Sequence, residues 1–235
     1  MFEFLKTRSE EEEIMDDFDC HGEVVNQTLR ELHSINTYLG GTNISLNSIR
    51  ALIRQHPQEK YRIVDLGCGG GDTLKLLAQW AASNKKSLQL TGIDANPHIV
   101  EYAQQNTQQF DNIQFYAEDI YSADFLSKKF DIAHCSLFLH HFDEEAIVEL
   151  FHQLQQQVSL GIVINDLHRH PISYYFTKWL LTAWSRSTMV KNDSVLSVAR
   201  SFTRKELTQY LASAKIKNYT LKWKWAFRWE LVIHA

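Results

Sequence analysis

Four of the nine glycines in this 235-residue chain fall within five consecutive positions, in the run Asp65-Leu66-Gly67-Cys68-Gly69-Gly70-Gly71-Asp72. Glycine lets a backbone turn sharply and approach a ligand closely. The run follows a short apolar stretch and precedes an amphipathic one, an order that predicts a strand, a turn and a helix N-terminus. Free N–H groups at such a terminus bind ligands at the carboxyl end of an open α/β sheet.

The spacing of these glycines discriminates between ligands. A dinucleotide-binding turn has the pattern G-x-G-x-x-G, which would place its third glycine at position 72. That position is Asp72, whose carboxylate suits a pyrophosphate poorly, so a nicotinamide oxidoreductase is a weaker interpretation. The third glycine is Gly71, giving G-x-G-x-G with Asp65 two residues ahead. A turn that binds nothing is disfavoured because the strand and helix that such a motif requires are both predicted.

Acidic residues also follow the next two predicted strands. Asp94 ends the second strand, where a carboxylate can accept hydrogen bonds from both ribose hydroxyls. Taken alone, Asp94 is equally typical of a helix cap. Asp119 and Ile120 follow the third strand, where the acid can accept a bond from an adenine amino group and the isoleucine can pack on the ring. A turn aspartate beside a core isoleucine is the alternative.

Strands alternate with helices over the middle of the chain, which predicts a parallel sheet covered by helices on both faces. The predicted strands are 62–66, 88–93, 112–117, 130–135 and 158–164, and the helices between them are 72–82, a helix from 97, and 143–157. Two further strand-like runs, 216–225 and 227–233, are spaced as an antiparallel hairpin.

Helices are expected outside this alternation. Residues 1–20 are acidic and polar and predict a mobile arm or a short surface helix, and two helices follow, over 25–39 and from 42 or 43 to about 57. Residues 172–184 carry apolar side chains at helical spacing, a polar stretch follows, and Thr203 opens a short helix. The predicted parts are a helical arm or cap at 1–58, a ligand-binding core at 59–170, a helical lid insertion at 171–202, and a C-terminal helix and hairpin at 203–235.

Taken together, these features resemble the class I S-adenosylmethionine-dependent methyltransferases over about residues 61–166. The motifs that carry the resemblance are Asp65 to Gly71, Gly92-Ile93-Asp94-Ala95-Asn96-Pro97, Ala117-Glu118-Asp119-Ile120 and Phe130-Asp131-Ile132-Ala133-His134-Cys135-Ser136-Leu137. The resemblance implies an α/β fold of three layers, with a Rossmann-like seven-stranded sheet whose last strand is antiparallel.

The resemblance also implies S-adenosylmethionine as the cofactor. In that family the first strand's acid and glycines hold the methionine part, the second strand's acid holds the ribose, and the residues after strand three flank the adenine. The cofactor residues expected on this basis are Asp65, Gly67, Gly69, Asp94, Ala95, Asp119, Ile120 and Ser136.

Methyl transfer from a sulfonium is an in-line displacement, so orientation and the exclusion of water should dominate catalysis. A phenol, enol or carbon acid must also lose a proton, and a histidine that titrates near neutrality suits that step. His140 follows strand four and His168 follows strand five, and we expect one of the two to be the base. His168-x-His170 resembles a metal-ligand pair, but no acidic or cysteine ligands accompany it, so no metal is predicted.

The acceptor is expected to be small. The segment Cys135-Ser136-Leu137-Phe138 lacks the Asn/Asp-Pro-Pro-aromatic motif of enzymes that methylate nucleic-acid bases, and the net charge of −4 agrees. The apolar side chains of the predicted helix at 172–184 either pack on the core or form an aromatic wall, called here the aromatic ceiling, over the acceptor. The ceiling would consist of Tyr174, Tyr175, Phe176, Trp179 and Trp184.

Residues 192–202 are similar to a stretch in bacterial methyltransferases of quinone and polyketide pathways, which suggests a phenol, quinol or pyrone acceptor. We expect methylation on oxygen. Methylation on carbon, or a protein that binds S-adenosylmethionine without catalysis, are the alternatives.

Compartment and partners follow from simpler features. The three cysteines, Cys20, Cys68 and Cys135, are far apart in sequence and typical of reduced thiols. No apolar run reaches the about 18 residues of a membrane span. The N-terminus carries the acidic run 10–13 in place of the basic start of a secretory signal. We therefore expect a cytoplasmic protein with no nucleic-acid or membrane partner, while its oligomeric state is left open.

Overall fold

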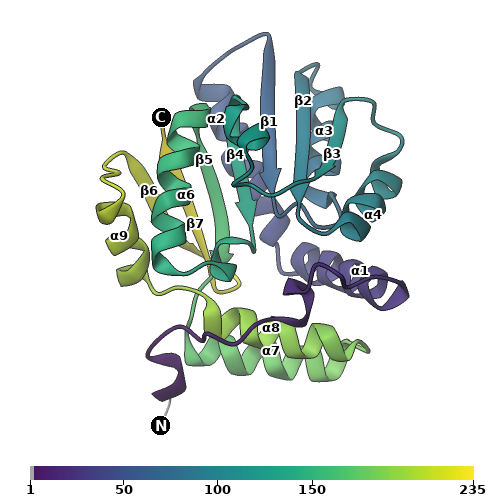
Figure 1. The fold of residues 1–235 in the computed structure, drawn as a ribbon, viewed down its shortest axis with the longest axis vertical. Coiled ribbons are helices and arrows are strands. Elements are labelled where there is room, and N and C mark those ends of the chain that lie inside the picture. The colour runs from purple at the N-terminus through teal and green to yellow at the C-terminus, as the bar shows by residue number, and fades with distance from the viewer. Residues whose placement is uncertain (1–2) are drawn as a thin grey trace.

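The strands form one seven-stranded sheet in the order β3-β2-β1-β4-β5-β7-β6, with helices on both faces (Figure 1). The structure, a computed structural model, describes residues 3–235, so residues 1–2 of the predicted arm lie outside the described residues. Strand β7 pairs antiparallel with both β5 and β6, and all other neighbours pair in parallel. The predicted fold class is therefore confirmed. The strands are β1 (Lys60–Leu66), β2 (Ser87–Asp94), β3 (Ile113–Ala117), β4 (Phe130–Ser136), β5 (Val158–Leu167), β6 (Tyr219–Lys224) and β7 (Arg228–His234).

Local signals in the sequence explain where the helices on the sheet begin. Asn96 caps α4 by accepting hydrogen bonds from the backbone N–H groups of His98 and Ile99, with proline at the first helical position. Asp143 caps α6 in the same way, and Thr203 forms a capping box at α9. These helices are α2 (Gly41–Gln55), α3 (Asp72–Ser83), α4 (Pro97–Thr107), α5 (Ala123–Ser127), α6 (Glu144–Gln157) and α9 (Arg204–Ser213).

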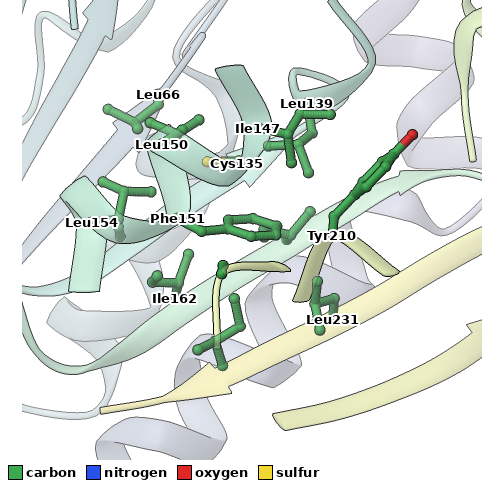
Figure 2. Packing of buried hydrophobic residues seen from close by; sticks show 14 of the residues in the cluster. Leu66, Cys135, Leu139, Ile147, Leu150, Phe151, Leu154, Ile162, Tyr210 and Leu231 are labelled. Atoms are coloured by element: carbon green, nitrogen blue, oxygen red, sulfur yellow. The ribbon is translucent and has the colours of Figure 1, made fainter. Parts of the chain in front are cut away.

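Two hydrophobic clusters fill the space on the two sides of the sheet. Successive residues of a strand alternate between them, so Val64 belongs to the cluster under α5, α6 and α9, and Ile63 to the cluster under α2, α3 and α4. Figure 2 shows the ring of Phe151, from α6, among side chains of β4, β5, α9 and β7. Burial on both faces explains the continuous buried runs in β1, β4 and β5.

Three further helices, called here the covering helices, lie across the carboxyl ends of the parallel strands (Figure 1). They are α1 (Glu23–Tyr38), α7 (Pro171–Trp184) and α8 (Thr188–Arg200). Two short 3-10 helices, η1 (Glu3–Leu5) and η2 (Ile14–Asp16), precede α1, and a third, η3 (Leu139–His141), follows β4. Within residues 3–235, no helix is long and apolar enough to cross a membrane.

The polar stretch predicted after α7 contains a further helix, α8, whose bounds were not predicted from the sequence. Its buried face mixes apolar residues such as Val190 and Val198 with the polar residues Asp193, Ser197 and Arg200. Asp193 accepts hydrogen bonds from the backbone N–H groups of residues 14 and 15, and Ser197 donates one to Glu13. The partners lie about 180 residues earlier in the chain, so apolar periodicity does not reveal the helix.

Replacing Phe151 with alanine should destabilise the protein by about 3–5 kcal/mol, because the fully buried ring leaves a cavity between α6 and the sheet. Urea unfolding of the purified variant measures the loss. Phe18, whose side chain is 63% exposed, provides the matched control, and Phe18→Ala should change the free energy of unfolding by about 0.5 kcal/mol or less. Equal losses in the two variants would contradict this description of the core.

Candidate functional site

A cavity of about 950 Å³ lies between the carboxyl ends of the strands and the covering helices. Every residue predicted to hold the cofactor lines it, and so does His140, whereas His168 does not. Parallel strands all end at the same edge of a sheet, so residues that are distant in sequence meet there. The predicted lining residues are Asp65, Gly67, Gly69, Asp94, Ala95, Asp119, Ile120 and Ser136.

The glycine turn after β1 needs its glycines for conformation and for space. Gly67, Gly69 and Gly71 have φ angles of 61°, 51° and 75°, in the left-handed region that side chains disfavour. A Cβ atom on Gly67 would also lie 2.2 Å from the ring of Phe138. The turn therefore brings bare backbone to the cavity wall beside α3.

Asp94 connects the end of β2 to this turn. Its Oδ2 accepts a hydrogen bond from the backbone N–H of Gly69 at 3.1 Å, and its Oδ1 accepts one from Asn96 at 3.1 Å. Burial raises the pKa of Asp94. Each carboxylate oxygen can accept a second hydrogen bond, so the group retains acceptor capacity toward a ligand in the cavity.

Asp65 begins a chain of buried polar groups that the sequence did not reveal. Its Oδ1 lies 2.6 Å from Nδ1 of His134 on β4, whose Nε2 lies 2.8 Å from Oγ of Ser45 on α2. Asn165 on β5 donates to the same hydroxyl at 3.1 Å and to the carbonyl of Gly41 at 2.9 Å. This chain fixes the Asp65 carboxylate and joins four elements of the fold, β1, β4, α2 and β5. A histidine and an asparagine inside otherwise apolar strands were the only signals in the sequence.

The remaining predicted cofactor residues occupy the rim of the cavity. Asp119 is exposed and accepts a hydrogen bond from the backbone N–H of Tyr121 at 2.9 Å, while Ile120 is buried. Ala95 is exposed beside Asp94, and the hydroxyl of Ser136 accepts a 3.4 Å hydrogen bond from Asn165. An exposed acid and a buried apolar side chain are thus adjacent at the end of β3.

His140 is buried in the turn after β4 and has a carboxylate on each side. Its Nδ1 lies 2.7 Å from Oδ1 of Asp166, and its Nε2 lies 3.4 Å from Oε1 of Glu13. Burial lowers the pKa of His140, but Asp166 and Glu13 outweigh it and raise that pKa to about 9. Both ring nitrogens therefore carry a proton at neutral pH, and the ring is a hydrogen-bond donor. A general base must instead have a free nitrogen to accept a proton.

His168 lies outside the cavity lining, near the hairpin of β6 and β7. Its Nδ1 accepts a hydrogen bond from Nε1 of Trp223 at 3.2 Å, and its ring contacts Trp229. Burial, together with the charges of His170 and Arg169, lowers the pKa of His168 to about 4. The structure does not bring this histidine to the site.

Residues 8–16, called here the N-terminal segment, attach to the turn that carries His140. Arg8 donates to the carbonyl of His140 at 2.8 Å. Asp16 lies 2.6 Å from Nδ1 of His141 and accepts a hydrogen bond from Arg200 of α8, also at 2.6 Å. The acidic sequence of this segment is also typical of a solvated arm, so these contacts were missed.

Ligand-type atoms of Glu13, His140 and His141 lie within 4.8 Å of one another. The His168-x-His170 pair considered from spacing lies elsewhere. In the cluster, Asp166, Asp16 and Glu13 already pair with the two histidine rings. Asp16 also pairs with Arg200, while Arg8 donates to the backbone carbonyl of His140. The three carboxylates of the cluster are thus engaged by the two histidines and Arg200.

The expected aromatic ceiling is mostly wrong. Of its five residues only Phe176 lines the cavity, together with Ser173, Thr177, Leu180 and Leu181 of the same helix. The apolar stripe does not seal the core either, because Ile172 and Trp179 are 62% and 67% exposed. The face of α7 that lines the cavity contains both polar and apolar residues. Apolar periodicity alone does not determine which way a helix is rotated about its axis.

Residues 63–161 match a family model described as a methyltransferase domain. This match identifies a methyltransferase domain within the chain, and the sheet order is Rossmann-like. The methyl donor of such a domain is S-adenosylmethionine. No protein of curated function matches the chain in sequence.

Solved structures share the fold at low sequence identity. The plantazolicin methyltransferase BamL, in complex with S-adenosylhomocysteine and a triazolic desmethylPZN analogue, is 22% identical, with a TM-score of 0.64 over 84% of this chain and 70% of its own. The magnesium protoporphyrin IX methyltransferase ChlM of Synechocystis is 15% identical, with a TM-score of 0.56 over 92% and 90% of the two chains. A Nostoc punctiforme protein assigned as an O-methyltransferase is 13% identical, with a TM-score of 0.59 over 90% of this chain. The match spans 59% of that protein's length.

The ion pairs of His140 make stability depend on pH. Because folding raises the pKa of His140 to about 9, its contribution is complete below about pH 6.5, the unfolded value, and is lost as pH rises through about 9. We expect the free energy of unfolding to fall over this range by on the order of 1–3 kcal/mol. Glu13→Gln should flatten the dependence, as measured by urea unfolding at each pH.

The neighbouring Glu12 is exposed, so Glu12→Gln is the matched control and should keep the wild-type pH profile. A wild-type profile in Glu13→Gln would show that Glu13 does not hold the proton on His140.

Proposed function

We propose that this protein transfers the methyl group of S-adenosylmethionine to an oxygen of a small aromatic or lipophilic acceptor. The observation that carries the proposal is the shared cavity, which is lined both by the glycine turn with its acids and by the covering helices. Its volume of about 950 Å³ is at the upper end of the about 300–1,000 Å³ typical of small-molecule sites. A cofactor and an acceptor can therefore meet in one cavity.

The lining residues support a specific position for the cofactor. Asp65, Gly67 and Gly69 would hold its methionine part, since the left-handed glycines expose backbone groups there. The free acceptor capacity of Asp94 suits the ribose hydroxyls. Asp119 would accept a bond from the adenine amino group. Ile120 and Ala95 would flank the base, and Ser136 would line the space beside the sulfonium.

The other half of the cavity wall supports an apolar acceptor. Phe138 and Phe142 make an edge-to-face contact, with ring centroids 5.0 Å apart, on the sheet side. Phe176, Leu180 and Val190 of the covering helices also line the cavity. Aromatic and aliphatic walls favour a flat, weakly polar molecule such as a phenol, quinol or pyrone.

Transfer would proceed by direct displacement. S-adenosylmethionine would supply the methyl group to the acceptor oxygen, with the electron pair of the broken carbon–sulfur bond left on sulfur. The enclosure supplies orientation and excludes water. His140 lies between the carboxylates of Asp166 and Glu13 and would act as a fixed positive charge in the cavity wall. An acceptor that is already ionised on oxygen would need no base.

Asp94→Ala should weaken the binding of S-adenosylhomocysteine by about 10- to 100-fold, because a charged hydrogen-bond acceptor is removed. Isothermal titration calorimetry measures the affinity. Asp124→Ala, at an exposed acid of α5 that does not line the cavity, is the control and should leave the affinity unchanged. Unchanged affinity in Asp94→Ala would remove Asp94 from the ribose site, and tight binding of NAD in place of S-adenosylhomocysteine would overturn the proposal.

Incubation of the protein with S-adenosylmethionine and a panel of phenols, quinols and pyrones should yield a product heavier by one methyl group. Mass spectrometry detects the product, and NMR assigns the methyl to oxygen or carbon. A methyl on carbon would establish the alternative chemistry. Tight cofactor binding with no product from any acceptor would instead support a protein that binds the cofactor without catalysis.

A further inference from the structure

Arg228, the first residue of β7, is a buried cation on the cavity wall. Its side chain is 3% exposed and lines the cavity. Its one hydrogen bond to the described part of the chain is a long one, 3.4 Å from Nη1 to Oδ1 of Asn165, and its Nε has no partner. Among residues 3–235 it forms no ion pair. Nothing assigned so far to the cofactor or to the turn after β4 uses this guanidinium.

The buried carboxylates at this end of the sheet are engaged elsewhere. Asp166 pairs with His140, and Asp65 pairs with His134. Glu230, on the same face of β7, pairs with Lys224 at 3.2 Å and accepts a hydrogen bond from Ser48 at 2.7 Å. Burial lowers the pKa of Arg228 to about 10, although Asp166 opposes the change, so the group stays charged at neutral pH.

The surroundings of Arg228 add positive potential. A Cβ atom on Gly41 would lie 2.7 Å from Cζ of Arg228, so the guanidinium lies against the first residue of α2. The N-terminus of a helix is itself the positive end of its dipole. Oδ1 of Asn36 lies near the same point without a hydrogen-bond partner, but a neutral amide does not balance a charge. A buried charge without a counterion costs several kcal/mol.

We propose that Arg228 binds an anionic oxygen group, a carboxylate or an ionised enol or phenol, of a molecule that fills the cavity. Guanidinium groups bind such oxygens with two parallel hydrogen bonds. The anion has two possible sources, the acceptor itself or the methionine carboxylate of the cofactor. The inference rests on the proposed function and deepens it, because an acceptor bound as its anion attacks the methyl group without first losing a proton.

The test compares wild type with Arg228→Met by isothermal titration calorimetry. The ligands are S-adenosylhomocysteine, 5′-methylthioadenosine (which lacks the amino-acid part), benzoate and 4-hydroxy-6-methyl-2-pyrone. Benzamide and 4-methoxy-6-methyl-2-pyrone are the neutral counterparts of the last two. The variant should lose about 10- to 100-fold in affinity for the molecule that supplies the anion.

The pattern of losses identifies the source. A loss for S-adenosylhomocysteine but not for 5′-methylthioadenosine indicates the cofactor carboxylate. A loss for benzoate or the hydroxypyrone but not for the neutral counterparts indicates the acceptor. The proposal is wrong if the variant and wild type bind S-adenosylhomocysteine equally well and also bind both anions equally well. It is also wrong if S-adenosylhomocysteine binds equally well to both proteins and neither protein binds the anions.

A stability measurement separates ligand binding from a structural role. Arg228→Met should unfold, without ligand, at the wild-type temperature or above it, because an uncompensated buried charge is removed. A large loss of stability would assign Arg228 to the fold and contradict the proposal. Arg50→Met is the matched control, since Arg50 also has an unpartnered Nε but stacks over Trp80 away from the cavity lining.

Two further variants keep the test decisive if Arg228→Met does not fold. Arg228→Lys keeps the charge and loses the paired hydrogen bonds, and Gly41→Ala displaces the guanidinium without removing its charge. Both should weaken binding of the same ligand by a smaller factor than the methionine variant, and wild-type affinity in both would overturn the proposal. Failure of wild type to bind S-adenosylhomocysteine would refute the proposed function. The role of Arg228 in binding anions is measured separately, with benzoate and the hydroxypyrone.

Discussion

The carboxylate of Asp166, at the end of β5, is the group on which the arrangement above the sheet depends. It accepts hydrogen bonds from the backbone N–H groups of Leu139 and His140 and lies 2.7 Å from Nδ1 of the His140 ring. The turn after β4 is thereby fixed to the neighbouring strand. His140 then faces Glu13, and its carbonyl accepts from Arg8. One buried charge thus connects the sheet to the N-terminal segment and, through the contact of Arg200 with the same carbonyl, to α8.

Helix α8 is joined to the N-terminal segment by charged and polar contacts, and apolar side chains line the cavity wall. Asp16 with Arg200, and Asp193 with the backbone at residues 14 and 15, are contacts of this kind. Had the cover been sealed by apolar packing, fewer apolar side chains would remain to meet an acceptor. The exposed stripe of α7 shows the same division, because its most apolar face points away from the molecule.

The two charged groups of the site have opposite environments. His140 lies between two carboxylates, which hold its proton, whereas Arg228 is a buried cation with no ion pair among the described residues. The positive charge of His140 is compensated by carboxylates, whereas that of Arg228 is not. The cavity should therefore bind a molecule that carries a negative charge. Native sites commonly retain such a local cost in stability because the ligand offsets it.

The sequence by itself determined the sheet, the glycine turn and the acids that follow the first three strands. These features depend on local rules: apolar periodicity, the conformational freedom of glycine at residues 67–71, and the convergence of parallel strand ends at one edge. Only the tertiary structure decided which histidine reaches the cavity, which face α7 presents, and that Glu13, Arg200 and Arg228 belong to the site. Those outcomes depend on contacts between segments far apart in the chain, and a charged residue has the same local pattern in sequence whether solvent or a buried partner surrounds it.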